Sequence, residues 1–511
     1  MNTSSDFLWR LIHSLSSSEK LFFKRNYIGA TGQALYIKLF NAIAVQKNYN
    51  EEAILKKFTP QLNRKNIASQ KHYLLQLISD AIVEYDSRNS IGHSIYKQML
   101  LIRVYRKKGL LSEAHSVWKK AVARARQTES YAILNLLKAE YEKMILSSSV
   151  HISYAEMHSI FKGHLITHTQ YAGLITLRDI YAEVLILKRT AHFDLDKTLK
   201  EKTRVLLQQV DDYSSALDTK SFWLRHYYQL SKATLLYLLN EIPGSFQLLQ
   251  QSLKDWEKNP SFIETHGEHY IELLYMINYA GTLHGSYEYV EHVFNLTIND
   301  QLQDKTQRAN FEAVKYLALN KVYNKTARYK DVEKLVKSMK TKYRLWEPVL
   351  NADLNRTVSL SLGIASFVLE QYDDALYFTK RGAIYFKDGG REEHSAVAQV
   401  LLLLIAYSLN NARIFDAQYR TTYTYFYKRK KKHLFETALV QCLRRTFYMK
   451  DAKSKIEEYK KALEVFVQNK EDNVQQQSFA IFNYPGWLTS KIRRIPYRQY
   501  VEQKVKESSL A

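Results

Sequence analysis

Residues 98–126 decide the fold of this chain, and they read QMLLIRVYRKKGLLSEAHSVWKKAVARAR. Large, small and turn-forming residues recur in this stretch at fixed offsets, at Tyr105, Gly109, Ala114, Trp118 and Ala121. Glycine readily adopts the positive φ that ends a helix. The two small alanines let neighbouring helices approach closely, and the tryptophan ring fills the space beside the next helix pair. The stretch therefore predicts two antiparallel helices joined by a tight turn at Gly109.

The same layout recurs downstream in GSYEYVEHVF, ARYKDVEKLV, EQYDDALYFT and RIFDAQYRTTY. These segments align at one position of the second helix, namely Val290, Val332, Ala375 and Ala417. Successive positions are 42, 43 and 42 residues apart, and Phe246, in a hairpin opened by Pro243, comes 44 residues before Val290. A constant spacing of this size predicts an array of stacked helix pairs.

The hairpins resemble tetratricopeptide repeats (TPRs), lengthened to 42–44 residues from the common ~34. The resemblance is clear over 93–126 and 268–430 and looser over 131–257 and 434–470. It implies an all-α fold, a right-handed α-α superhelix (TPR-like solenoid) of stacked antiparallel helix pairs. We expect an N-terminal helical cap in 1–90, the repeat array in 91–470, and a C-terminal cap or arm in 471–511. Within the cap, Ser16 and Glu19 fit a capping box, and GATGQ at 29–33 is expected to be a loop.

The composition agrees with a helical array. The chain has 511 residues but only 15 Gly and 6 Pro, where average usage would give roughly 35 and 25. Most of the 38 tyrosines are expected to fill gaps between helices. The one cysteine, Cys442, can form neither an internal disulfide nor a cysteine metal cage, and its apolar neighbours predict a buried structural thiol. The longest apolar run, Val400–Tyr407, is far shorter than the ~20 residues of a membrane span, and the chain does not open on a signal-peptide pattern, so we expect a cytoplasmic protein.

The sequence lacks the common motifs of catalysis and cofactor binding. It contains no Gly-rich phosphate loop, no HExxH and no GxSxG. His266 and His269 are spaced to share a helix face, but zinc needs further ligands, so we interpret them as the polar start of a helix. The sequence therefore predicts neither an enzyme nor a cofactor.

The charge points to an anionic partner, since 74 Lys and Arg oppose 51 Asp and Glu for a net +23. Two segments, 98–126 and 419–433, hold much of the excess. Their candidate anion-binding residues are Arg103, Arg106, Lys107, Lys108, Lys119, Lys120, Arg124, Arg126, Lys428, Arg429, Lys430, Lys431 and Lys432. Tyr423, Tyr425 and Tyr427 precede the second run and could stack on exposed bases. Solvated helix faces and turns would explain the same charges.

Three functions fit the sequence. The first is a non-catalytic scaffold that binds a protein or peptide on the solenoid surface. The second is an RNA/DNA- or ribosome-associated binding module that uses the segments 98–126 and 419–433. The third is a transcriptional regulator whose helices at YNEEAILKKF and NRKNIASQKHYLLQL form a helix-turn-helix, with reading residues at Arg64, Lys65, Ser69, Gln70 and Lys71. An ordinary helical hairpin explains those two helices more simply, because no distinguishing turn residue separates them.

Overall fold

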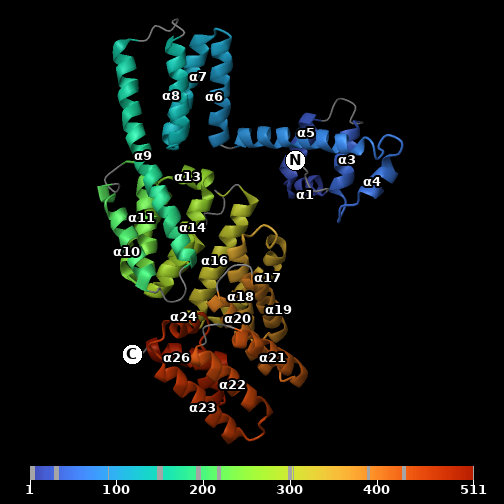
Figure 1. Ribbon diagram of the computed structural model, residues 1–511, viewed down its shortest axis with the longest axis vertical. Coiled ribbons are helices and arrows are strands. Elements are labelled where there is room, and N and C mark those ends of the chain that lie inside the picture. The colour runs from blue at the N-terminus through green and yellow to red at the C-terminus, as the bar shows by residue number, and fades with distance from the viewer. Residues whose placement is uncertain are drawn as a thin grey trace. The chain divides into compact units, whose positions relative to one another are not determined.

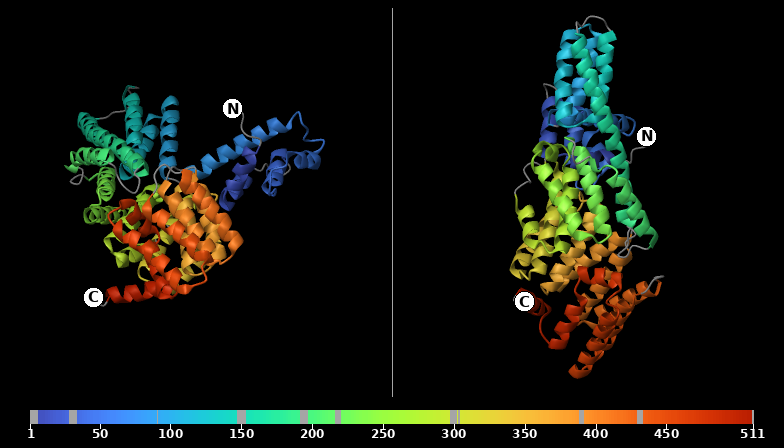
Figure 2. Two further views of the ribbon diagram at one scale, coloured as in Figure 1. Left: turned by 60° about the horizontal axis from the view of Figure 1, so that its bottom comes forward. Right: turned by 90° about the vertical axis from the view of Figure 1, so that its left-hand side faces the viewer.

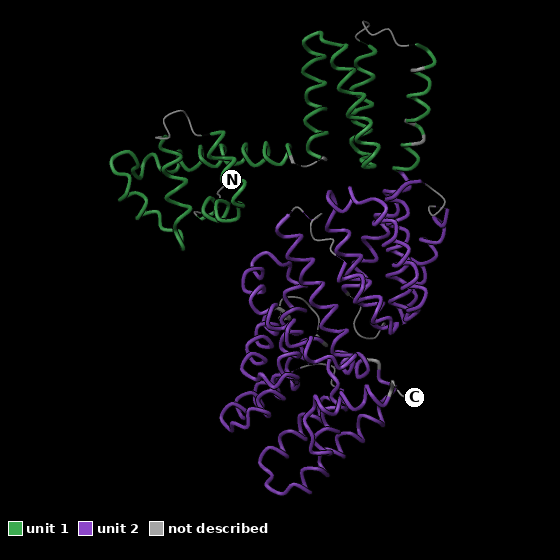
Figure 3. The backbone as a smooth tube through the Cα atoms, turned by 180° about the vertical axis from the view of Figure 1, so that it is seen from behind, with its two compact units in different colours: residues 1–171 green, residues 172–511 purple. Residues whose placement is uncertain are grey.

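The computed structural model describes residues 6–27, 34–89, 91–146, 153–190, 197–215, 220–296, 302, 304–387, 392–428 and 433–509. In these ranges the regular elements are the helices α1 to α26, without a strand, so the predicted all-α class is confirmed (Figure 1). The loop expected at 29–33 lies outside the described residues. Two compact units, 1–171 and 172–511, divide the chain (Figure 3). The predicted domain boundaries at 90 and 470 stay predictions.

The first unit begins with five helices around an apolar core that includes Ile12, Phe23, Phe40 and Leu74. They are α1 (Phe7–Ser14), α2 (Ser17–Tyr27), α3 (Leu35–Ala44), α4 (Glu51–Phe58) and α5 (Ile67–Asn89). The predicted capping box opens α2. The Ser16 N–H donates to the Glu19 carboxylate at 2.6 Å, and the Glu19 N–H donates to the Ser16 hydroxyl at 3.2 Å. This reciprocal pair fixes the start of the helix.

The hairpin predicted from residues 98–126 is confirmed as α6 (Ile91–Lys107) and α7 (Leu111–Gln127). Gly109 between them has a φ of 77°, and Ala114 and Ala121 are fully buried. The Trp118 indole N–H donates to the Leu137 carbonyl at 2.8 Å, and its ring stacks on Tyr141 at 4.3 Å. Leu137 and Tyr141 belong to α8 (Tyr131–Leu146), so the tryptophan joins the hairpin to the next helix, as the spacing predicts.

The second unit stacks helix pairs in chain order, seen as the sequence of colours from green to red in the right panel of Figure 2. Helix α9 (Tyr154–Thr190) enters this unit from the first and is followed by α10 (Lys197–Asp211). The pairs are α11 (Phe222–Leu238) with α12 (Ile242–Glu257), α14 (Gly267–His284) with α15 (Tyr287–Asn295), α16 (Lys305–Lys325) with α17 (Tyr329–Trp346), α18 (Ala352–Val368) with α19 (Tyr372–Lys387), α20 (Glu392–Ser408) with α21 (Ala412–Lys428), and α22 (Leu434–Tyr448) with α23 (Ala452–Gln468). The first helices α14, α16 and α18 also pack on one another. The short α13 (Pro260–Thr265) lies between α12 and α14.

Five of these pairs turn in the same way, through one residue of positive φ. These residues are Asn240, Gly285, Ala327, Glu370 and Asn410, with φ between 53° and 83°. In four of the turns the next N–H donates to the carbonyl five residues back, at 2.8–2.9 Å, as from Arg328 to Tyr323. This bond closes the end of each first helix. A common turn therefore sets the geometry of successive hairpins even where it contains no glycine.

The repeat register is confirmed at three of the aligned positions and corrected at the fourth. Val290, Val332 and Ala375 are fully buried, and each is the fourth residue of its helix. The fourth residue of α21 is the fully buried Phe415, whereas the predicted Ala417 is exposed. The prediction at Ala417 was wrong because α21 begins two residues earlier than constant spacing would place it. In α12 the fourth residue is the buried Ser245, directly before Phe246.

The chain ends in three further helices, α24 (Asn473–Ile481), α25 (Tyr484–Arg493) and α26 (Tyr497–Ser509). Helix α24 packs on α20, α25 on α23, and α26 on α25. The C-terminal segment therefore returns over the array instead of extending it. No helix among the described residues is both long and apolar enough to cross a membrane.

Candidate functional site

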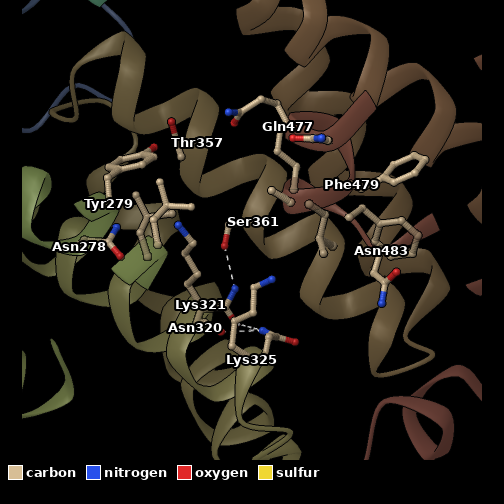
Figure 4. Close-up of a pocket in the computed structure, with 18 of the residues that line it drawn as sticks. Asn278, Tyr279, Asn320, Lys321, Lys325, Thr357, Ser361, Gln477, Phe479 and Asn483 are labelled. Carbon is tan, nitrogen blue, oxygen red and sulfur yellow. Dashed lines mark hydrogen bonds between the residues drawn. The ribbon is translucent and has the colours of Figure 1, made fainter. Parts of the chain in front are cut away.

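A groove of about 1220 Å³ lies within the second unit. One wall comes from the first helices of successive pairs, α11, α14, α16 and α18, and another from α24 and α26. Figure 4 shows Asn278 and Tyr279 on one side and Gln477, Phe479 and Asn483 on the other, with Lys321 and Lys325 between them. Pockets for small molecules usually enclose about 300–1000 Å³. This groove is large enough for a longer ligand.

The repeat places three rows of side chains along the groove. One row is Tyr275, Leu317 and Leu360; the next is Tyr279, Lys321 and Ile364; the third is Leu283, Lys325 and Val368. The members of each row stand at equivalent positions of α14, α16 and α18, and neighbouring rows are four residues apart on each helix. Residues four apart share one helix face. The groove is therefore the inner face of the stacked pairs, and α16 alone contributes lysines to these rows.

Lys321 is the most perturbed cation of the groove. It is partly buried, and its Nζ lies 5.2 Å from the centre of the Tyr279 ring. Burial, with a contribution from Lys325, lowers the pKa of Lys321 to about 8. Neither Lys321 nor Lys325 forms an ion pair with a carboxylate of the described residues. Two neighbouring ammonium groups on one helix thus face the groove without an acidic partner there.

Amide side chains lie beside these lysines. Asn320 donates from Nδ2 to the Ser361 hydroxyl at 2.8 Å and accepts at Oδ1 from Asn324 at 3.0 Å (Figure 4). Asn278, at the position of α14 equivalent to Asn320, is 3% exposed. Its Oδ1 has no hydrogen-bond partner among the described residues. A buried acceptor left without a partner costs about 1–3 kcal/mol, and a donor from a ligand would satisfy it.

The wall from α24 and α26 is anchored to the array by aromatic contacts. The Phe482 ring packs on Phe367 of α18 at 5.6 Å and on Tyr497 at 5.6 Å, and the Arg498 guanidinium lies 5.1 Å from the centre of the Tyr329 ring. Phe482, Tyr497 and Tyr329 also line the groove. The C-terminal helices therefore form part of the site.

The candidate anion-binding residues of segment 98–126 lie in the first unit. Arg103 and Arg106 approach the buried carboxylate of Glu140 at 2.8 and 3.6 Å, and Lys143 approaches it at 3.2 Å. Burial opposes ionisation of Glu140, but hydrogen bonds from Arg103 and Lys143 hold its pKa below the ordinary value. The remaining members of the segment are exposed, at Lys107, Lys108, Lys119, Lys120, Arg124 and Arg126.

The candidates of segment 419–433 lie in the second unit, and only part of them is described. Lys428 is exposed at the end of α21, whereas Arg429, Lys430, Lys431 and Lys432 lie outside the described residues. Tyr423 and Tyr427 are exposed and stack on each other at 6.3 Å. Anion binding by either basic segment stays a prediction.

The helices proposed to read DNA are α4 and α5. Arg64 lies 3.7 Å from Glu52, and Ser69 donates its hydroxyl to the Asn66 carbonyl. Lys71 donates to the Glu51 carboxylate at 2.8 Å and to the Tyr49 hydroxyl at 2.9 Å. These contacts hold Lys71 against the preceding helix. DNA reading by this region stays a prediction.

His266 and His269 lie in an aromatic cluster. Both rings pack on Trp223, at 4.7 and 5.4 Å. The fully buried His226 accepts at Nδ1 from the Trp256 indole N–H at 3.2 Å. Burial lowers the pKa of all three histidines, that of His266 to about 4. In the described part of the chain, no group of three or more His, Cys, Asp and Glu side chains is arranged to hold a metal ion.

Cys442 is buried, as its apolar neighbours predict. Burial raises the pKa of its thiol to about 12. A thiol of such high pKa stays protonated at neutral pH and makes a poor nucleophile.

The groove-lining residues were not singled out from the sequence, although a signal for them exists. Tyr279, Lys321 and Ile364 are 42 and 43 residues apart, the spacing that also relates Val290, Val332 and Ala375. Extending the repeat to the first helices of the pairs would have aligned these positions. The lysine at the middle position would then have stood out between an aromatic and an aliphatic residue.

Comparison with known proteins finds similarity to solved structures. The chain is similar to the apo form of the quorum sensor NprR from B. thuringiensis, with 14% sequence identity and a TM-score of 0.41 over 79% of this chain and 99% of that chain. No family model and no curated protein matches the chain. The TPR-like character of the protein thus rests on its own hairpins and turns.

Proposed function

We propose that this protein is a non-catalytic TPR-like scaffold that binds an extended peptide segment of a partner in the groove of its second unit. The observation that carries the proposal is the composition of the groove: rows of aromatic and aliphatic side chains that contain two lysines and have amide side chains beside them. Apolar rows supply area for burial, whereas asparagine side chains can both donate to and accept from a peptide backbone. The free acceptor of Asn278 is one such group.

The volume favours a peptide over a metabolite, because about 1220 Å³ exceeds the usual range for small molecules. An extended segment also matches a groove whose rows follow three consecutive first helices. The proposal assigns peptide binding mainly to the first helices of the pairs and packing mainly to the second helices.

A pool of random-sequence octapeptides offered to the full-length chain tests this function. Peptides retained after gel filtration would be quantified by mass spectrometry. Ile364→Trp should abolish retention, because the larger side chain fills the middle row of the groove. Val467→Trp is the matched control, since Val467 is 64% exposed on α23 and does not line the groove. Equal retention by wild type and Ile364→Trp, or no retention by wild type, would contradict the proposal.

A further inference from the structure

The charged side chains that line the groove, among the described residues, are all positive. Seven of its lining residues are Lys or Arg, namely Lys188, Arg189, Lys200, Arg204, Lys321, Lys325 and Lys504. Among the described residues, no Asp or Glu lines it. Some of these cations are neutralised nearby, as Lys188 is by Glu272 at 2.9 Å and Lys504 by Glu507 at 2.6 Å. Lys321 and Lys325, one turn apart on α16, form no such pair with a carboxylate of the described residues.

Lys321 stands where the neighbouring repeats carry uncharged side chains. Its equivalents are Tyr279 on α14 and Ile364 on α18, and the equivalents of Lys325 are Leu283 and Val368. A lysine at such a position loses solvation without gaining a carboxylate from the described chain. Structural packing alone would be served better by another apolar residue, so the position of Lys321 calls for an anionic partner from outside.

We propose that the groove selects peptides that carry a carboxylate, and that this carboxylate pairs with the Lys321 ammonium group. The inference rests on the peptide-binding function proposed above and names the ligand class. Binding would neutralise a partly buried charge that already stacks on Tyr279 and would relieve its repulsion from Lys325.

The row that holds Lys321 favours the single charge of a carboxylate, and Lys325 lies one turn along α16 in the next row. The row of Lys321 offers only one ammonium group, with a phenol ring on one side and an aliphatic chain on the other. A carboxylate matches that single charge, whereas the amides of Asn278 and Asn320 would take neutral groups of the same peptide. The carboxylate could come from an Asp or Glu side chain or from the end of the peptide chain.

Three octapeptide pools, identical except for the carboxylate, test the proposal and separate its two sources. The first carries one central Glu and a C-terminal amide, the second a central Gln and an amide, and the third a central Gln and a free C-terminal carboxylate. All three are acetylated at the N-terminus, and their other positions exclude acidic residues. We expect the full-length protein to bind the first or the third pool about tenfold more tightly than the second, as for one charge-assisted hydrogen bond.

Substitutions at Lys321 assign the preference to this residue. Lys321→Gln and Lys321→Met should both remove it, and circular dichroism would verify that each variant is folded. Lys330→Gln is the matched control, because Lys330 is exposed on α17 and does not line the groove; it should keep the preference. Equal binding of the three pools by wild type would overturn the carboxylate inference and leave peptide binding intact. A preference that survives both Lys321 substitutions would overturn it as well, and failure of all three pools would instead remove the proposed function itself.

Discussion

At the scale of single residues, His226, His266 and His269 show how burial controls charge. Their rings pack against Trp223 and against one another. A protonated His226 could not accept the hydrogen bond from the Trp256 indole N–H at Nδ1. His226 is therefore neutral in the folded protein. Arg178 further disfavours protonation of His266 and His269, whereas Glu268 favours it.

This cluster predicts loss of stability in mild acid. Because the folded-state pKa values lie below the ordinary 6.5, the unfolded chain takes up protons first as the pH falls. The contribution of these histidines to the free energy of unfolding should be at its full value above about pH 6.5 and should decrease toward pH 4. For the buried His226 the slope is at most about 1.4 kcal/mol per pH unit. Urea denaturation between pH 7 and pH 5 measures the slope.

Two substitutions sharpen this measurement. His266→Gln should reduce the slope, because it removes one of the three depressed groups. His292→Gln is the control, since His292 is exposed on α15. A slope left unchanged by His266→Gln would show that the acid sensitivity arises elsewhere.

At the scale of elements, the turn between paired helices is the repeating unit of construction. Ala327 and Glu370 adopt the left-handed conformation at φ of 55° and 60°, where side-chain-bearing residues are strained. Gly285 fills the equivalent place without strain at φ of 83°. The backbone geometry of the turn is thus conserved among the pairs while its residue varies.

Ala327→Gly should therefore stabilise the protein by about 0.5–1 kcal/mol, because the left-handed conformation costs glycine nothing. Gly285→Ala is the mirror experiment and should destabilise it by about 1 kcal/mol. A Cβ at Gly285 would meet no atom within 4 Å, so the change reports on the backbone alone. Chemical denaturation of both variants measures the two effects, and shifts of the same sign would contradict the argument.

The elements also show what sequence reasoning can predict. Buried residues at constant spacing, such as Val290 and Val332, predict the second helix of each pair, because an apolar stripe must pack. The predicted register is wrong at Ala417, because a shorter repeat moves the equivalent position to Phe415. Asn240 and Asn410 in the turns are compatible with many conformations, so only Gly109 and Gly285 predict their turns from the sequence.

The groove was harder to predict than the fold. Lys321 can be recognised as a candidate site residue only when the fold places it near Tyr279 and the C-terminal helices, which come from distant parts of the chain. In a strongly basic sequence a single lysine is expected to be exposed to solvent. The charge runs at 98–126 and 419–433 give a much stronger sequence signal than Lys321 does. Local charge density identifies exposed surfaces well and partly buried cations poorly.

At the scale of the whole molecule, the proposed binding groove and the buried carboxylate of Glu140 lie in different units. All residues that line the groove belong to the second unit, whereas the buried Glu140 and its partners Arg103, Arg106 and Lys143 belong to the first. Three cations surround this single carboxylate, two of them within hydrogen-bonding distance.

Glu140→Ala should destabilise the first unit by about 1–2 kcal/mol, because it removes a buried carboxylate and leaves the partly exposed Arg103 and Arg106 without their partner. It should leave the affinity of the groove for the random octapeptide pool unchanged. Limited proteolysis would locate the weakened helices, and gel filtration would report binding. Peptide binding lost while the second unit stays protected from the protease would contradict this separation of roles.

The return of α24 and α26 onto the array has a consequence for synthesis. The groove takes residues from Lys188 to Val505, and its second wall is translated after the helix pairs that form the first. Helix pairs can fold one after another as they leave the ribosome, since each contacts mainly its neighbours. A nascent chain therefore carries an open, unfinished inner face, and peptide affinity should develop only as translation of the second wall is completed.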